Sequence, residues 1–346
     1  GMRVVQLFNR EARNREVFGR LSEDHRQASL AGVRAYALFF PAINTLVLVA
    51  MALLIVAGGS RILDRDLSFG TFLAFWYYAQ KFFHPILDLA EKYNVFQAAM
   101  ASSERIFTLL DTPPAVAPPA APAGPPGPLR GEVEFRDVTF AYDEGPVVLD
   151  RVSLRARPGE RLALVGPTGG GKTTVASLLG RLYDVRDGSV RVDGVDVRAY
   201  DPVRLRRQIG VVLQDVFCFA GTLETNIRLG ETGIPRERLE AAARTANADR
   251  LVARRGGWDA PVPERGATLS AGEKQLLGLA RALAFDPRIL VLDEATSNVD
   301  TETEALIQDA LGKAMAGRTA LVIAHRLSTV MACDRILILH GGRIRE

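Results

Sequence analysis

Lysine and cysteine are both scarce in this chain of 346 residues. The two cysteines, Cys218 and Cys333, lie far apart without CxxC or histidine-rich spacing, so we expect neither a disulfide framework nor a zinc site. Arginine supplies most of the 43 basic residues, and lysine occurs only at positions 81, 92, 172, 274 and 313. Against 40 acidic residues the formal net charge is only +3, so no nucleic-acid partner is expected.

Charge is missing altogether from residues 35–60, which follow a polar, arginine-rich start. As a helix, these 26 residues would be about 39 Å long, enough to cross a hydrocarbon core of about 30 Å. The alternative is a buried core helix, but such helices rarely run past about 20 uncharged residues. We therefore predict a transmembrane span over about residues 35–60.

A second apolar and aromatic run begins at residue 67 and soon reaches Lys81. Hydropathy alone is ambiguous for so short a run. A second crossing is required, however, if the arginine-rich start and the rest of the chain both lie in the cytoplasm, as the positive-inside rule suggests. We expect this second span at about residues 67–90.

Proline is concentrated in residues 111–130, which hold eight of the 18 prolines. Segments of this composition are semi-extended spacers with no core of their own. The segment therefore predicts a linker and a domain boundary.

From Gly131 onward the sequence has the pattern of a globular domain. EVEFRDVTFAY and VVLDRVSLRAR alternate like antiparallel strands. Short buried-strand patterns follow, separated by helical segments such as KTTVASLLGRLY; they are RLALVG, ILVLD, TALVIA and RILIL. Buried strands alternating with helices predict a mainly parallel sheet with helices on its faces.

The strongest local motif is GPTGGGKT, a full match to G-x4-G-K-[ST] between a buried strand and a helix. Glycines let backbone N–H groups approach phosphate oxygens, and the N-terminus of the following helix adds partial positive charge. Lys172 would bridge the terminal phosphates, and the Thr173 hydroxyl would bind Mg²⁺. The sequence thus predicts a nucleotide site here.

A second, acidic motif is ILVLDE, in which a buried strand ends at Asp293 and Glu294 follows. An aspartate at the carboxyl end of a strand can hold Mg²⁺, usually through water, and the adjacent glutamate can polarise an attacking water. Alone this pair is weak support for a site. Combined with the phosphate loop earlier in the chain, it becomes strong.

LSAGE, at residues 269–273 shortly before ILVLDE, resembles the LSGGQ signature of ATP-binding cassette (ABC) ATPases. The resemblance extends to Gln214 in VVLQD, to SNVD, which ends at Asp300, and to His325 in IAHRL. Tyr142 in FAY occupies the place of the aromatic residue that stacks on adenine in this family. The resemblance implies an α/β P-loop NTPase of the ABC type, with an antiparallel β subdomain and a helical subdomain.

The resemblance also implies ATP and Mg²⁺ as cofactors and assigns roles to residues that match the family motifs. Catalytic roles fall on Glu294, His325 and Gln214, and Mg²⁺ ligation falls on Thr173, Gln214 and Asp293. The nucleotide-binding residues implied are Tyr142, Gly166, Pro167, Thr168, Gly169, Gly170, Gly171, Lys172, Thr173, Thr174, Ser270, Gly272, Glu273 and Asp300. Ser270, Gly272 and Asp300 would act on the nucleotide of a second cassette.

The first 110 residues are similar to the fifth and sixth membrane helices of type IV ABC exporters, and ERG at 264–266 resembles the exporter X-loop. The resemblance implies a half-transporter of the bacterial multidrug or lipid exporter kind, truncated at its amino terminus. We expect residues 1–110 to be the end of an α-helical transmembrane domain with its last two spans, 111–130 a linker, and 131–346 the ATP-binding cassette.

The function implied is ATP hydrolysis that drives export of a drug, lipid or peptide-like substrate. The expected partners are a second half-transporter, identical or different, the lipid bilayer and the exported molecule. The expected location is the cell membrane, crossed more than once, with the cassette in the cytoplasm. A non-transport ABC ATPase of DNA repair or translation would lack the uncharged run, and a regulatory, non-hydrolysing half would lack Glu294.

Two residues depart from the family signature. Ala271 adds a methyl group where the backbone packs near phosphate, and Glu273 brings an acid near the nucleotide. Ser270 and Gly272, the two hydrogen-bond donors, are kept. We therefore expect the contribution of this signature to the opposite site to be intact.

Overall fold

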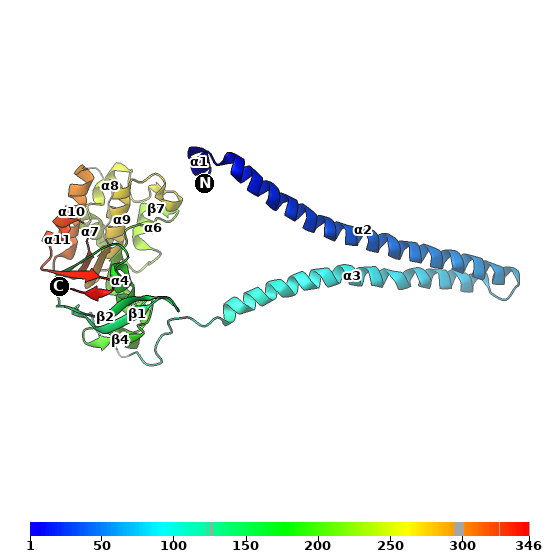
Figure 1. Cartoon of the computed structure of the whole chain (residues 1–346), viewed down its shortest axis with the longest axis horizontal. Coiled ribbons are helices and arrows are strands. Elements are labelled where there is room, and N and C mark those ends of the chain that lie inside the picture. Colours follow the sequence, from blue (N-terminus) through cyan, green and yellow to red (C-terminus); the bar gives the residue numbers. More distant parts are fainter. Residues whose placement is uncertain (123, 125–126, 294–300, 325, 346) are drawn as a thin grey trace. The chain divides into compact units, whose positions relative to one another are not determined.

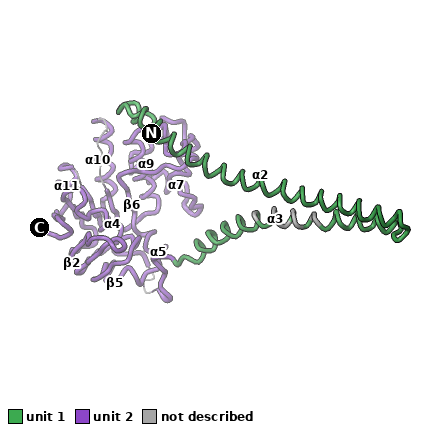
Figure 2. Tube along the Cα trace, turned by 45° about the vertical axis from the view of Figure 1, so that its right-hand side comes forward, with its two compact units in different colours: residues 1–113 green, residues 114–346 purple. Residues whose placement is uncertain are grey.

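The structure is a computed structural model that describes all residues except 123, 125–126, 294–300, 325 and 346 (Figure 1). The chain divides into two compact units, Gly1–Pro113 and Pro114–Glu346 (Figure 2). This boundary lies near the start of the proline-rich segment, so most of that segment belongs to the second unit.

The first unit is helical. Its helices are α1 (Met2–Leu7), α2 (Glu11–Leu63) and α3 (Phe69–Asp111). The N-terminus of α3 is capped by the Ser68 hydroxyl, which accepts a hydrogen bond of 3.1 Å from the backbone N–H of Thr71. Gly58 of α2 packs directly on the Phe72 ring of α3, where an added Cβ would lie 2.6 Å from the ring. The close approach of the two helices therefore depends on glycine at position 58.

Helix α2 contains the whole uncharged run of residues 35–60, and most of its apolar side chains are exposed. Among the described residues, α2 is the one helix that is long and apolar enough to cross a membrane, judged by length and composition. Pro41 lies inside it, and the Thr45 hydroxyl donates a hydrogen bond of 2.8 Å to the Pro41 carbonyl. The second span expected at about residues 67–90 falls in α3, and that crossing stays a prediction.

The second unit contains an antiparallel sheet of order β2-β1-β4-β5 and a six-stranded sheet of order β12-β11-β3-β10-β9-β6. The first sheet is built from β1 (Val133–Ala141), β2 (Val147–Ala156), β4 (Asp187–Val192) and β5 (Val195–Asp196). The second is built from β3 (Arg161–Val165), β6 (Ile209–Val212), β9 (Ile289–Asp293), β10 (Thr319–Ile323), β11 (Arg335–His340) and β12 (Arg343–Ile344). A short ladder joins β7 (Gly221–Thr222) to β8 (Pro261–Val262).

The strand pairings confirm the fold class expected from the sequence. β1 and β2 are antiparallel, as their alternating pattern predicts. β3, β6, β9, β10 and β11 run parallel to one another, and β12 is antiparallel to β11. All five residues of β10 are buried, because helices cover both faces of the sheet.

Eight helices of the second unit are described: α4 (Lys172–Leu179), α5 (Pro202–Arg207), α6 (Leu223–Arg228), α7 (Arg236–Thr245), α8 (Asp249–Arg254), α9 (Ala271–Ala284), α10 (Thr301–Met315) and α11 (Leu327–Met331). Two short 3₁₀ turns are η1 (Val197–Ala199) and η2 (Glu264–Gly266). The helical pattern KTTVASLLGRLY predicts a helix longer than α4. The helix ends at Leu179 because Gly180 follows it and Arg181 adopts a left-handed conformation (φ 48°).

Alternate residues of β9 and β10 belong to two separate hydrophobic cores. Ile289 and Val291 pack in one core with side chains of α4 and of the antiparallel sheet. Leu290 and Leu292 pack in the other core with α9 and α10. Because successive side chains of a strand point to opposite faces, α4 and α9 cover opposite faces of the parallel sheet.

The proline-rich segment, expected as a spacer, contacts the second unit at several points. The Arg181 guanidinium donates a hydrogen bond of 2.9 Å to the carbonyl oxygen of Ala117. Leu129 is buried in the core of the antiparallel sheet. The backbone N–H of Arg130 donates a hydrogen bond of 2.6 Å to the Asp193 carboxylate. Apolar and backbone contacts thus hold parts of a segment whose composition alone suggests a free linker.

Candidate functional site

The phosphate-loop motif follows β3, Asp293 ends β9 and Gln214 lies just after β6, and all three strands belong to the parallel sheet. Ile323 of β10 pairs with Leu164 of β3 and with Asp293 of β9. β6 lies beside β9, and Gln214 is exposed in the loop after β6. The carboxyl ends of parallel strands meet at one edge, which is where α/β sheets bind ligands. The sheet therefore gathers these residues at one edge.

The loop of residues 166–171 requires glycine at its first and last positions, Gly166 and Gly171. Gly166 (φ 153°) lies so close to β11 that an added Cβ would overlap a carbonyl oxygen of that strand. Gly171 (φ 97°) precedes α4, and a Cβ there would lie 2.6 Å from the Leu149 side chain. The backbone N–H of Gly170 donates a hydrogen bond of 3.1 Å to the Pro167 carbonyl and closes the turn. The sequence folds this way because only glycine fits these conformations without strain.

Lys172 is the first residue of α4 and is only 5% exposed. Its Nζ donates hydrogen bonds of 2.9 Å to the carbonyl oxygens of both Gly166 and Pro167. Burial lowers the pKa of the Lys172 ammonium, and the nearby Asp293 carboxylate opposes this shift. Neutral carbonyls are weaker partners for a buried cation than an anion would be, so this ammonium is suited to a phosphate.

Thr173 and Asp293 join the phosphate loop to the end of β9. The exposed Thr173 hydroxyl donates a hydrogen bond of 3.2 Å to Oδ2 of Asp293. A cleft of about 310 Å³ lies beside this contact; its lining includes Thr173, Ser177, Leu213 and Asp293. Thr173 and Asp293 therefore line the same open cleft.

The donor set at this cleft fits Mg²⁺ bound together with a nucleotide. Among the described residues, no group of three or more His, Cys, Asp or Glu side chains could hold a metal ion by itself. Mg²⁺ commonly takes one or two protein oxygens and completes its shell with phosphate oxygens and water. Thr173 and Asp293 supply one hydroxyl and one carboxylate, which matches that habit.

Tyr142 directly follows β1 and reaches the first turn of α4. Its hydroxyl and that of Thr174 share a hydrogen bond of 3.0 Å. Its ring meets the buried Phe140 ring nearly at right angles, with centroids 4.9 Å apart. Tyr142 keeps 37% of its surface exposed, so the residue remains accessible next to the first turn of α4.

LSAGE forms the start of α9. The Ser270 hydroxyl accepts the backbone N–H of Glu273 at 3.2 Å, and the Glu273 carboxylate accepts the N–H of Ser270 at 2.8 Å. This reciprocal pair is a capping box. The same carboxylate forms ion pairs with Arg254 and, at 3.3 Å, with Arg255. The acid that departs from the family signature is therefore buried and compensated within its own chain.

The structure brings some of the expected site residues together and separates others. Tyr142, the phosphate loop and Asp293 lie around the N-terminus of α4. Ser270, Gly272 and Glu273 begin α9, which packs on the opposite face of the sheet. Pro167, Thr168 and Gly169 are exposed. Glu294, Asp300 and His325 lie outside the described residues.

Two family profiles match the chain. The profile described as "ABC transporter" matches residues 149–297, and that described as "ABC transporter transmembrane region" matches residues 1–86. The first match contains the phosphate loop and Asp293, and the second contains α2. The chain belongs to the ABC transporter family.

Relatives of this ABC chain include several bacterial transport proteins. It is 41% identical over 349 residues to the uncharacterized ABC transporter ATP-binding protein YknV of Bacillus subtilis, covering all of the chain and 58% of that protein. It is 41% identical over 350 residues to a fatty acid ABC transporter ATP-binding/permease protein of Mycobacterium bovis, again over the whole chain and 54% of the relative. Identity to the ATP-dependent lipid A-core flippase of Syntrophus aciditrophicus is 39% over 347 residues, over the whole chain and 57% of the relative.

A solved structure of a bacterial Atm1-family ABC exporter with ATP bound is similar to this ABC chain throughout. The TM-score is 0.87 and the sequence identity 34%, covering 100% of this chain and 61% of the exporter chain. The chain thus spans a little over half the length of the relatives it matches. These matches bear out the expected fold, a helical transmembrane region followed by an ABC ATPase domain with an antiparallel sheet.

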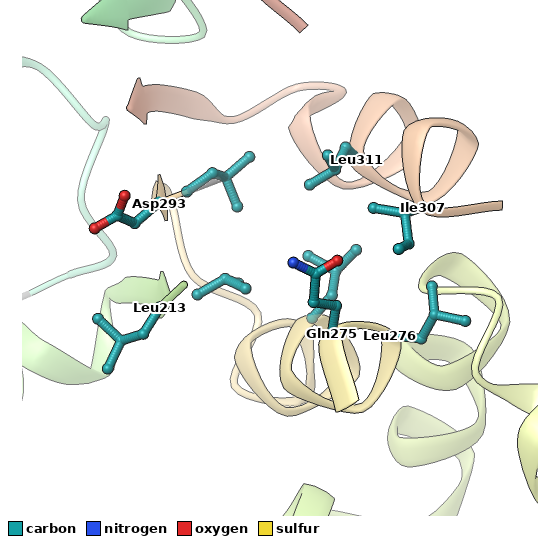
Figure 3. Close-up of a pocket in the computed structure, with 9 residues that line it drawn as sticks. Leu213, Gln275, Leu276, Asp293, Ile307 and Leu311 are labelled. Carbon is teal, nitrogen blue, oxygen red and sulfur yellow. The ribbon is translucent and has the colours of Figure 1, made fainter. Parts of the chain in front are cut away.

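Sequence reasoning missed Gln275, which lines a small cavity of about 30 Å³ next to the nucleotide motifs of this ABC chain. Its side-chain oxygen is buried and has no hydrogen-bond partner among the described residues. Figure 3 shows Gln275 between Leu213 and Ile307, with the Asp293 carboxylate pointing away from it. The cavity is large enough for a water molecule, which would satisfy this oxygen. Arg254 and Arg255 were missed too, because nothing in local sequence links them to Glu273.

Proposed function

We propose that this ABC chain is the ATP-binding and ATP-hydrolysing half of an exporter. In this proposal, ATP-driven association of two cassettes moves a substrate across the membrane. The observation that carries the proposal is the phosphate loop, in which buried Lys172 and the Thr173–Asp293 contact meet at the N-terminus of α4. The exposed apolar helix α2 on the same chain favours an exporter over a soluble ABC ATPase.

ATP binding is assigned to residues around α4. Backbone N–H groups of residues 166–174 and the Lys172 ammonium bind the phosphates, since the helix N-terminus and the buried cation both favour negative charge. Tyr142 stacks on the adenine ring. Thr173 and Asp293, with Gln214, would hold Mg²⁺, which neutralises charge on the phosphate oxygens when it is bound.

Hydrolysis is assigned to Glu294, which polarises the attacking water, with His325 and Gln214 as further catalytic residues. Glu294 follows Asp293 directly at the end of β9, so its position in the chain is suited to a water beside the terminal phosphate. The roles of Glu294 and His325 rest on their place in the family motifs. The role of Gln214 also has support from its position after β6, beside β9.

A second cassette completes each nucleotide site in this proposal. The Ser270 hydroxyl, the Gly272 N–H and Asp300 of one chain face the nucleotide bound to the other. Because Arg254 and Arg255 both pair with Glu273, the start of α9 does not present an uncompensated acid to that nucleotide. The proposal covers both a homodimer of two copies of this chain and a heterodimer with a different half-transporter.

The proposed cargo is a lipid, drug or peptide-like molecule, and the proposed site of action is the cell membrane with the cassette in the cytoplasm. The names of two relatives, a fatty acid transporter and a lipid A-core flippase, support the lipid class. The two spans expected in residues 1–110 are too few to enclose a transport pathway by themselves. We therefore assign the ATP chemistry to this chain and transport to the assembled exporter.

Nucleotide binding is tested by replacing the buried lysine. Lys172→Ala removes the cation next to the phosphates, so ATP affinity should fall about tenfold or more. Lys313→Ala is the matched control, because Lys313 is an exposed lysine of α10 that pairs with Asp309. Binding of a fluorescent ATP analogue to the purified chain measures both variants. Undiminished affinity in Lys172→Ala would contradict the assignment of the phosphate loop.

Hydrolysis is tested separately with Glu294→Gln, in the chain together with its partner. This variant should bind ATP with normal affinity and lose turnover by about 100-fold or more, because the amide cannot polarise the attacking water. Glu302→Gln, an exposed residue in the first turn of α10, serves as the control. Phosphate release gives the turnover. Unchanged turnover in Glu294→Gln would remove Glu294 from the mechanism.

A further inference from the structure

Tyr183, a residue with no role in the family motifs, stands beside Tyr142, whose hydroxyl contacts the first turn of α4. The planes of the two rings meet at 89°, and the ring centroids are 5.1 Å apart. Both remain partly open to solvent, Tyr142 at 37% and Tyr183 at 45% exposure. Tyr142 also contacts Thr174 in the first turn of α4, so the pair lies near the residues that would bind the phosphates.

The Tyr142 ring is fixed by three contacts from different parts of the chain. Phe140, which is 3% exposed, packs edge-to-face with Tyr142 and lies 5.8 Å from the Tyr183 centroid. Thr174 of α4 shares a hydrogen bond with the Tyr142 hydroxyl. Tyr183 supplies the third contact. Thr174 holds the hydroxyl end of the tyrosine, while Phe140 and Tyr183 both contact its ring edge-to-face.

The loop that carries Tyr183 is itself held firmly. Arg181 is 4% exposed, and its guanidinium bonds to the Asp184 carboxylate at 3.0 Å and to the Tyr200 carbonyl at 3.3 Å. On the other side of Tyr183, the backbone N–H of Arg186 donates a hydrogen bond of 3.1 Å to the Thr139 carbonyl of β1. The loop is therefore anchored on both sides of Tyr183, next to the strand that presents Tyr142.

We propose that Tyr183 is a positioning residue that fixes the plane of the Tyr142 ring for a purine base. The proposal rests on the proposed function, in which Tyr142 stacks on adenine. A ring already held in the stacking orientation loses less conformational freedom when the base binds, so affinity for the base-containing nucleotide rises. Tyr183 has no part in holding the phosphates, which belong to α4 and its loop.

The experiment compares ATP with inorganic tripolyphosphate, which carries the phosphates without a base. In the full chain, Tyr183→Ala should weaken ATP about three- to tenfold, the range expected for loss of one aromatic pair. Its affinity for tripolyphosphate should be unchanged, which also shows that the variant is folded. Tyr183→Phe keeps the edge-to-face contact and should bind ATP as the unaltered chain does. Phe217→Ala, which removes an exposed ring from another edge-to-face pair, is the matched control.

A double-mutant cycle separates positioning from direct contact. If Tyr183 acts through Tyr142, Tyr142→Ala combined with Tyr183→Ala should bind ATP no more weakly than Tyr142→Ala alone. Additive losses would overturn the proposal, because Tyr183 would then contact the base independently. Equal weakening of ATP and tripolyphosphate by Tyr183→Ala would also overturn it. The proposed function fails by a different result, namely ATP affinity that survives Lys172→Ala.

Discussion

Helices α4 and α9 both begin at a nucleotide motif, but their first turns are satisfied in different ways. α4 follows Gly171, and no side chain of the described residues caps it. α9 follows Ser270, which forms a complete capping box with Glu273. Uncapped N–H groups at a helix start are available to an anion, whereas a capping box already satisfies two of them.

The contrast extends to the charged residues at each start. Lys172 is a buried cation whose hydrogen bonds go to neutral carbonyls, while Glu273 is a buried anion paired with two arginines. The start of α4 therefore gains most when a phosphate arrives, and the start of α9 is stable by itself. This agrees with the proposal that α4 binds the nucleotide of its own chain and α9 only completes the site of another.

The largest effect on this comparison is expected from Gly171→Ala. A Cβ there meets Leu149 at 2.6 Å in a left-handed conformation, so strain and overlap together should lower the free energy of unfolding by about 2–4 kcal/mol. ATP binding should be lost with it. Gly159→Ala is the control, because Gly159 is also left-handed (φ 78°) but has open space around it. Urea unfolding followed by tryptophan fluorescence measures both variants. Equal stability of the two variants would show that the loop tolerates a side chain.

A smaller effect is expected at the start of α9. Ser270→Ala removes the N-cap and should lower the free energy of unfolding by about 1 kcal/mol. Glu273→Gln keeps the reciprocal hydrogen bond but removes the charge that pairs with Arg254 and Arg255, so it should also lower the free energy of unfolding. Neither change should alter ATP affinity at the phosphate loop of the same chain. A loss of that affinity in Ser270→Ala would mean that the two helix starts are coupled within one cassette.

The smallest effect is a pH dependence at Lys172. Its pKa is lowered from 10.5 in the folded chain, so the folded state releases this proton before the unfolded state does. At neutral pH the folded chain carries the free-energy cost of burying the charged Lys172 ammonium. This cost disappears as the pH rises from the lowered pKa toward 10.5, because the folded chain then loses the proton. The stability of the unaltered chain relative to Lys172→Met should therefore rise over this window. Urea unfolding at both ends of the window checks it, and a constant or falling difference would contradict the shift.

Much of the fold was predictable because its signals are local. The alternating runs became β1 and β2, the short apolar runs became β3, β9, β10 and β11, and the glycine-rich motif preceded α4 as expected. The phosphate loop was predictable for the same reason, since its chemistry needs specific residues at fixed spacing. The end of α4 was misplaced, because a left-handed Arg181 overrides the helical pattern that continues through Tyr183.

Contacts between distant segments were not predictable from pattern. Leu129 is buried in the core of the antiparallel sheet, and the Ala117 carbonyl accepts a hydrogen bond from Arg181. The composition of their segment predicts only a linker. The pairing of Glu273 with Arg254 and Arg255 likewise joins α9 to the end of α8 and appears in no motif.

The scarcity of lysine in the sequence already marked position 172, because the phosphate-loop motif requires a lysine there. The uncharged run 35–60 likewise predicted a membrane span, and the proline-rich segment predicted a linker. Both predictions rest on composition alone. Only the tertiary structure decided which side chains meet at the site: the strand order that puts Asp293 beside Thr173, the burial of Lys172, and the loop that brings Tyr183 to Tyr142. These depend on packing between segments far apart in sequence, and no local pattern records such packing.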